Sequence, residues 1–158
     1  RAHLGRNAFL STGVMILPDL NLLLYAYNPK VPQHAKALAW WEDAVNGTEL
    51  IGLPHEILFS FIRISTNPRL GDATVPLTQA RTVVESWQQL SHSRILTPGP
   101  DHFSQVLDLM HHSHSAGSVL SDAILASYAI TNRATLYSND TDFARFEGLR
   151  WKNPLVSS

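Results

Sequence analysis

Four acidic residues of the chain have the spacing and setting expected of a catalytic carboxylate cluster. They are Asp19, Glu56, Asp122 and Asp140. Carboxylates brought together without a cation repel and raise one another's pKa, and a divalent metal removes that repulsion. Oxygen ligands in a chain without cysteine favour Mg²⁺, with Mn²⁺ able to substitute, over zinc. Such a site supports phosphodiester hydrolysis, because the cation activates water, orients the phosphate and neutralises developing charge.

The elements that must position these acids are short strands alternating with longer helices. Helical segments of ten or more residues between short apolar strands indicate an α/β fold with a parallel sheet wrapped by helices. Four strands are expected, with a short fifth at 149–151. The predicted strands are 15–19, 48–53, 94–97 and 134–138, and the longer helices are 34–46, 54–66, 78–91, 101–112 and 121–132.

The sheet explains why acids far apart in sequence are expected to meet. Asp19 ends the first strand, and Glu56 follows the second by three residues. Asp122 opens a helix, with Ser121 as its expected N-cap, and Asp140 follows the fourth strand by two residues. In an open parallel sheet, strand ends and the following helix starts share one edge, where ligands bind at the topological switch point.

Length and composition restrict the functions open to this chain. Its 158 residues are enough for one domain. Of these residues 44% are apolar and 16% are charged, a composition that indicates a globular chain. The absence of cysteine excludes a disulfide framework and a thiolate nucleophile, and it is compatible with the cytoplasm. A net charge of −1 gives no general affinity for nucleic acid, so a nucleic-acid partner would have to be held locally, through metal ions. No apolar run reaches the roughly 18 residues needed to span a membrane.

The first fourteen residues are expected to lie outside the domain. They carry two arginines and only a short apolar patch, AFL, which is too short for a signal peptide. We interpret residues 1–14 as an N-terminal extension, an expression remnant or a misplaced start ahead of Met15. The domain is then 15–158.

Four sequence blocks resemble, in order, the motifs of PIN domains. The first is MILPDLNLLLYAY, and the second, PHEILFSFIRISTNPRL, contains an acid, an Arg seven positions later and a Thr-Asn-Pro ending. The third is LSDAILASYA, and the last, ATLYSNDTDFARF, is a strand followed by Ser-x-Asp-x-Asp-Phe. Together they cover roughly 15–155, and the strongest similarity is to the VapC toxins of bacterial VapBC toxin–antitoxin pairs.

The resemblance implies a three-layer α/β/α PIN-like domain with a mostly parallel sheet of four to five strands. It further implies a Mg²⁺-dependent endoribonuclease that cuts tRNA, rRNA or mRNA. A homodimer is implied, inhibited by a VapB-type antitoxin whose tail enters the active site. By position, Asp19, Glu56, Asp122 and Asp140 match the family's acidic residues, and Asp142 matches an accessory acid. Asn21 and Ser138 match residues that orient the cluster, whereas Leu20 stands where Thr or Ser is common.

Each candidate also has a structural interpretation. Asp19 could end a strand, Glu56 and Asp122 could favour a helix N-terminus, and Asp140 could belong to a turn. Asp142 is equally suited to metal or water contact and to capping the short helix in DFARF. Arg63 lies two helical turns after Glu56. It could bind a substrate phosphate, pair with an acid of the cluster or form a structural ion pair.

The histidines favour structural roles. His34 precedes an Ala-rich helix, where packing or capping is more common than base catalysis. His111, His112 and His114 match no zinc-ligand spacing, and imidazoles suit the negative end of a helix dipole. The sequence leaves two further functions open: a PIN-fold RNA-processing nuclease outside a toxin pair, and a catalytically silent domain that binds RNA or protein.

Overall fold

A five-stranded parallel sheet forms the centre of the protein. The computed structural model describes residues 15–156, so the extension expected at 1–14 lies outside the described residues. The strand order is β3-β2-β1-β4-β5, and all four neighbouring pairs run parallel. The strands are β1 (Ile16–Pro18), β2 (Ile51–Pro54), β3 (Ser93–Leu96), β4 (Thr135–Tyr137) and β5 (Arg150–Lys152).

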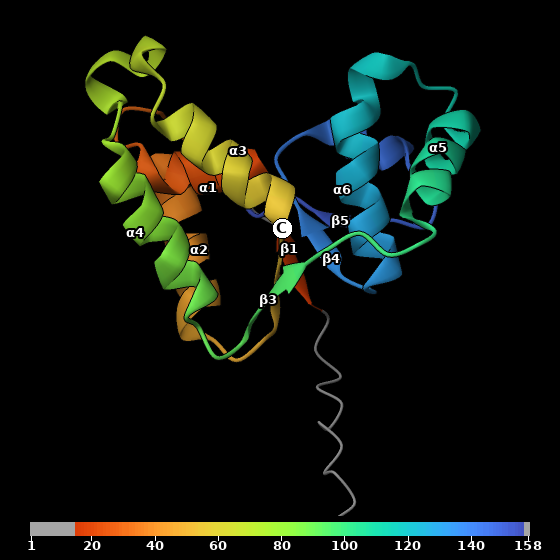
Figure 1. The fold of residues 1–158 in the computed structure, drawn as a ribbon, viewed down its shortest axis with the longest axis horizontal. Coiled ribbons are helices and arrows are strands. Elements are labelled where there is room, and N and C mark those ends of the chain that lie inside the picture. Colours follow the sequence, from red (N-terminus) through yellow and green to blue (C-terminus); the bar gives the residue numbers. More distant parts are fainter. Residues whose placement is uncertain (1–14, 157–158) are drawn as a thin grey trace, which may run out of the picture.

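Helices cover both faces of the sheet. Helices α1 to α4 pack together on one side, and α5 and α6 pack together on the other (Figure 1). This confirms the three-layer α/β/α prediction and the fifth strand. The helices are α1 (Leu20–Tyr27), α2 (His34–Asn46), α3 (His55–Ser65), α4 (Leu77–Gln88), α5 (His102–His112) and α6 (Leu120–Thr131), with short 3₁₀ turns η1 (Pro68–Ala73), η2 (Gly117–Val119) and η3 (Thr141–Arg145).

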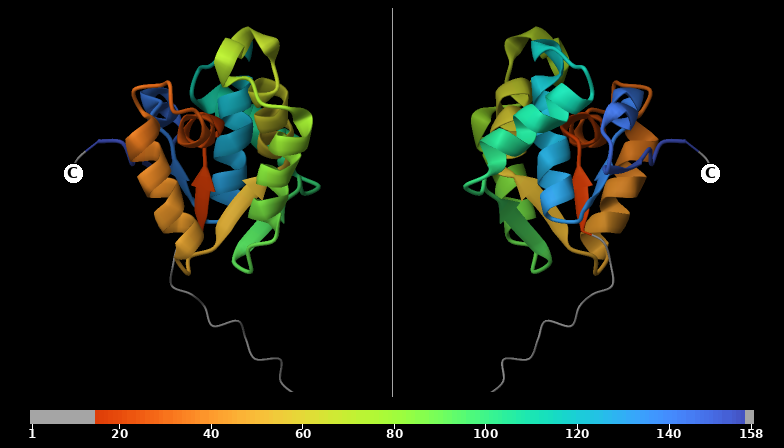
Figure 2. Two further views of the ribbon diagram at one scale, coloured as in Figure 1. Left: turned by 90° about the vertical axis from the view of Figure 1, so that its left-hand side faces the viewer. Right: turned by 90° about the vertical axis from the view of Figure 1, so that its right-hand side faces the viewer.

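The strand order creates a switch point between β1 and β4. From β1 the chain adds β2 and then β3 on one side, crosses to the other face through α5 and α6, and returns as β4 beside β1. The arrowheads of β1 and β2 point to the same edge in Figure 2, as parallel pairing requires. The chain segments that leave β1 and β4 at this edge diverge, and a ligand can reach the space between them.

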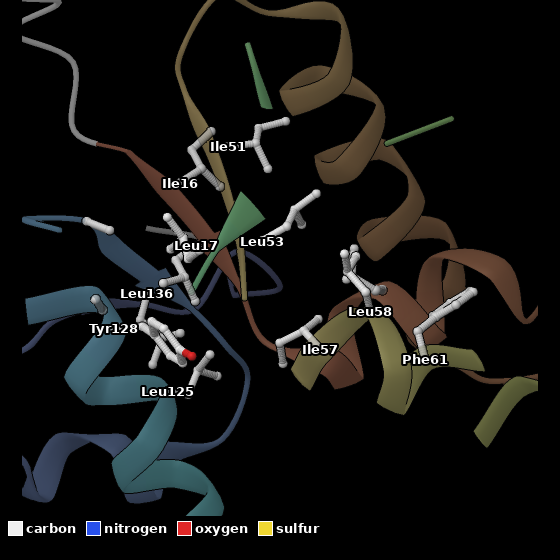
Figure 3. Close-up of a cluster of buried hydrophobic side chains, with 14 of the residues drawn as sticks. Ile16, Leu17, Ile51, Leu53, Ile57, Leu58, Phe61, Leu125, Tyr128 and Leu136 are labelled. Carbon is white, nitrogen blue, oxygen red and sulfur yellow. The ribbon is translucent and has the colours of Figure 1, made fainter. Parts of the chain in front are cut away.

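The core lies where the central strands meet the helices. Leu17, Leu53 and Leu136 have no exposed surface, and they come from three adjacent strands (Figure 3). Strand β1 is buried on both faces, as expected for a central strand of a parallel sheet. This packing holds the strand ends, and therefore the residues that follow them, in fixed relative positions.

One local prediction was wrong. Helix α6 begins at Leu120 and has no side-chain cap, because η2 leads directly into it and places the expected cap, Ser121, inside the first turn. Helix α5, in contrast, forms as predicted but buries little of its apolar face. Only Val106 is buried, and Phe103 is 75% exposed, because α5 packs mainly against α6 alone.

The adjacent tryptophans of α2 face different surroundings. Trp41 is buried in the core, and Trp40 packs against the ring of Tyr137 with centroids 5.1 Å apart.

None of the helices formed by residues 15–156 has the length and apolar character needed to cross a bilayer.

Candidate active site

Asp19 is held at the carboxyl edge of the sheet by two contacts to the neighbouring strand. Its backbone N–H donates to the carbonyl of Tyr137, 2.8 Å away, which extends the pairing of β1 with β4 by one residue. Its Oδ2 accepts a hydrogen bond of 2.7 Å from Ser138 Oγ, and Ser138 is fully buried. The carboxylate therefore has a fixed orientation at the first residue beyond β1.

The loop after β4 continues this hydrogen-bonded arrangement. Ser138 Oγ accepts from the backbone N–H of Asp140 at 3.0 Å, and Asp140 Oδ1 accepts from the N–H of Asp142 at 2.8 Å. Asp140 is thus the N-cap of η3, so the capping role considered for Asp142 belongs to Asp140. Asp142 is exposed and pairs with Arg145, whose Nη2 lies 3.6 Å from its Oδ1.

Asp122 lies in the first turn of α6 and shares an electrostatic environment with the acids of the strand ends. Its pKa is raised to about 6 by burial first, and then by the negative charges of Asp140, Asp19 and Asp142. Arg145 opposes this shift. The fold thus brings four aspartates from three separate segments close enough to repel one another.

Burial also raises the pKa of Asp19, and the charge of Asp140 adds to that effect. Hydrogen bonds from Ser138 and from the backbone N–H groups of Leu20 and Asn21 act in the opposite direction. The site therefore holds carboxylates whose charged forms are costly unless a cation or a proton compensates them.

Glu56 reaches the same region from the first turn of α3. Its Oε1 accepts a hydrogen bond of 2.8 Å from the Tyr128 hydroxyl, and His55 Nε2 lies 3.7 Å from the same oxygen. Its Oε2 is buried and has no hydrogen-bond partner among the described residues. Burial, followed by the hydrogen bond and charge of Glu56, raises the pKa of Tyr128, so the phenol stays a protonated donor.

A cavity of about 340 Å³ joins these elements. It is lined by two of the aspartates, Asp19 and Asp122, and by Glu56, whereas Asp140 and Asp142 lie beyond its walls. Asn21 and Arg63 also line it, and Arg63 forms no ion pair within residues 15–156. A larger cavity of about 670 Å³ lies beside α5 and contains none of the predicted acids, so we assign the site to the smaller one.

The donor set suits a hard divalent cation. All of the acids offer oxygen, and burial followed by their mutual repulsion raises the pKa of Asp122. The buried Oε2 of Glu56 lacks a hydrogen-bond partner among the described residues. In the described part of the chain, however, no three His, Asp or Glu side chains are arranged to hold an ion as they stand.

The histidines considered from the sequence lie away from this cavity. His34 Nδ1 lies 2.8 Å from the carbonyl of Tyr25 and connects α2 to α1. His111 and His112 form the last turn of α5, and His112 Nδ1 lies 2.6 Å from the carbonyl of Asp108. Both observations agree with the structural roles that the sequence favoured.

Tyr128 is the site residue that the sequence did not reveal. A signal was present, because it is the aromatic residue of a helix made mainly of small and aliphatic residues, LSDAILASYAIT. A buried tyrosine hydroxyl usually needs a hydrogen-bond partner, but the sequence does not indicate which residue provides it.

Comparison with known proteins agrees with this architecture. The family model described as PIN domain matches residues 16–149. Ribonuclease VapC33 of Mycobacterium tuberculosis is 44% identical over 141 residues, which cover 89% of this chain and 99% of that protein. Ribonuclease VapC43 of the same species is 35% identical over 141 residues, covering 89% and 96%.

A solved structure shares the fold at low sequence identity. A chain in the crystal structure of VapBC2 from Rickettsia felis, bound to a DNA fragment from their promoter, has a TM-score of 0.61 and 19% identity. The match covers 88% of this chain and 98% of that one. Together with the family match and the two relatives, the ordered motifs and the carboxylates at the switch point show that this chain belongs to the PIN-domain family and, within it, to the VapC group.

Proposed function

We propose that this protein is a metal-dependent endoribonuclease and the toxin of a VapBC-type toxin–antitoxin pair. Ribonuclease activity follows from its membership of the VapC group. The observation that supports the metal dependence is the one cavity that Asp19, Glu56 and Asp122 line together, in which burial and three neighbouring aspartates raise the pKa of Asp122. An acidic site of this kind binds an anionic RNA backbone only if cations supply the missing positive charge.

The residues of the site divide into those that would hold the cation and those that would orient other groups. Asp19, Glu56, Asp122 and Asp140 would bind Mg²⁺ or Mn²⁺, with Asp142 as an accessory acid. When bound, the cation would activate water and stabilise the charge that develops on the phosphate. Ser138 orients Asp19 through its 2.7 Å hydrogen bond. Asn21 lines the cavity and would help to orient the cluster, and Arg63 lines it and would contact the RNA phosphate.

The partners proposed for this chain follow from its relatives. A structural neighbour is a VapBC complex, which supports a VapB-type antitoxin as the cognate inhibitor. An antitoxin tail bearing an arginine would suit the acidic cavity. We further propose that the toxin is a homodimer that cleaves tRNA, rRNA or mRNA in the cytoplasm.

The test combines toxicity, metal removal and mapping of RNA ends. Induction of the wild type should arrest growth and produce new ends in tRNA, rRNA or mRNA, and co-expression of the antitoxin should relieve the arrest. Asp19→Asn should abolish both effects, whereas Asp43→Asn, an exposed carboxyl on α2, should behave as wild type. A fully toxic Asp19→Asn variant would refute the proposed site.

The purified protein provides a second test. Chelation by EDTA should stop cleavage without unfolding the protein, and added Mg²⁺ or Mn²⁺ should restore it. Attack by metal-activated water leaves 5′-phosphate and 3′-hydroxyl ends. Cleavage that persists in EDTA, or products with 2′,3′-cyclic phosphates, would contradict the metal-dependent mechanism.

A further inference from the structure

Tyr128 is a buried residue of α6 whose only polar atom contacts a carboxylate of the candidate site. It is 2% exposed, and its ring lies in the core near Leu125 and Leu136 (Figure 3). The ring of His102 packs against it, with centroids 4.6 Å apart. Its hydroxyl, on the side of α6 that faces Ile57 in Figure 3, donates to Glu56 Oε1 at 2.8 Å. Packing therefore presents this hydroxyl as a rigid donor.

The two oxygens of Glu56 consequently have different surroundings. Oε1 is engaged by Tyr128, with His55 Nε2 also 3.7 Å away. Oε2 is buried and has no partner within the described residues. A carboxylate binds a cation through both oxygens only when both are turned toward it. In this arrangement the Tyr128 hydrogen bond engages Oε1, and Oε2 is the oxygen that no hydrogen bond from the described residues occupies.

The difference between one-oxygen and two-oxygen binding matters for the choice of cation. Ca²⁺ takes six to eight oxygen ligands at about 2.3–2.6 Å and often binds a carboxylate through both oxygens. Mg²⁺ demands octahedral geometry at about 2.0–2.1 Å and binds few carboxylates. A carboxylate restricted to one oxygen therefore disfavours the larger ion.

We propose that Tyr128 is a positioning residue that restricts Glu56 to binding through Oε2 and so makes the site prefer small octahedral cations over Ca²⁺. This inference rests on the proposed function, because it assumes that Glu56 takes part in cation binding. It adds a residue outside the acidic cluster and a property, ion selectivity, that the cluster alone does not explain.

The test is a comparison of Mn²⁺ and Ca²⁺ binding by isothermal titration calorimetry on the full chain. Tyr128→Phe removes only the hydroxyl. Tyr27→Phe is the matched control, because it also removes a hydrogen-bonded tyrosine hydroxyl. The Tyr27 hydroxyl accepts from Trp87 Nε1 at 3.0 Å and lies outside the acidic cavity. Wild type and Tyr27→Phe should prefer Mn²⁺, and Tyr128→Phe should lose that preference by about tenfold or more, the scale typical of residues that orient metal ligands.

Two further variants make the result decisive. Glu56→Gln should remove the effect of Tyr128→Phe, since the two residues act together. His102→Ala leaves the hydroxyl in place but removes a ring that packs against Tyr128, so it should shift the preference in the same direction even if Tyr128→Phe does not fold.

The inference would be overturned if folded Tyr128→Phe kept the wild-type ratio of Mn²⁺ to Ca²⁺ affinity. If Tyr128→Phe does not fold, an unchanged ratio in His102→Ala would overturn it. Either result would leave the proposed function intact. Failure of the wild type and Tyr27→Phe alike to bind Mn²⁺ would overturn the metal dependence itself, and the inference with it.

Discussion

Ser138 and Asp19 are 119 residues apart in sequence, yet Ser138 Oγ donates a 2.7 Å hydrogen bond to Asp19 Oδ2. The same hydroxyl accepts from the backbone of Asp140. One buried serine thus fixes both the carboxylate that follows β1 and the loop that follows β4.

We predict that Ser138→Ala lowers RNA cleavage about 10- to 100-fold, because residues that orient metal ligands usually contribute on that scale. Ser138→Thr keeps the hydroxyl and should retain most of the activity. Single-turnover cleavage rates, measured on variants whose circular dichroism matches wild type, check this. Full activity in Ser138→Ala would show that the hydrogen bond does not matter for cleavage.

We predict that the metal-free protein is stabilised as pH falls through about 6. The pKa of Asp122 is about 6 in the folded protein and 3.8 as its ordinary value, so the folded state binds this proton more tightly. Its contribution to stability is fully present below 3.8 and is lost as pH rises through about 6. Urea unfolding in EDTA between pH 4 and pH 8 measures this effect.

The variant Asp122→Asn separates this contribution from that of other carboxyls. Relative to wild type it should be more stable at pH 7.5, and the difference should shrink toward pH 4.5. The difference between Asp43→Asn and wild type should stay constant over that range, because Asp43 is exposed. Parallel curves for wild type and Asp122→Asn would contradict the raised pKa.

We predict that Arg63→Ala raises KM for RNA about tenfold with a smaller effect on kcat. Arg63 lines the acidic cavity and has no ion-pair partner among the described residues, so its charge is available to a phosphate. Arg69→Ala is the control, because Arg69 is an exposed residue of η1. Steady-state kinetics on a short RNA measures both constants. A loss of kcat at unchanged KM would assign Arg63 to the transition state and not to substrate binding.

We predict that Leu17→Ala destabilises the protein by about 2–5 kcal/mol, because it creates a cavity at a fully buried position in the central strand. Leu77→Ala, at a residue that is 62% exposed, should change stability by less than about 0.5 kcal/mol. Free energies of unfolding from urea titrations check both values. Equal effects would show that β1 does not lie at the centre of the core.

Much of the fold could be read from local pattern. Short apolar runs alternating with helical periodicity predicted the parallel sheet. Asp19, expected to end the first strand, is the first residue after β1. The burial of α5 could not be read in this way, because periodicity shows which residues share a helix face but not whether another element covers that face. Phe103 lies on the apolar face of α5 and is 75% exposed.

The identity and approximate position of the acids are thus properties of the sequence, since carboxylates after strand ends meet at one edge of a parallel sheet. The partners of those acids depend on the packed structure. Tyr128 and Glu56 are 72 residues apart, and their 2.8 Å contact requires a particular separation of α6 and α3. A hydrogen bond forms only within a few tenths of an ångström, and core packing alone sets distances between helices that precisely.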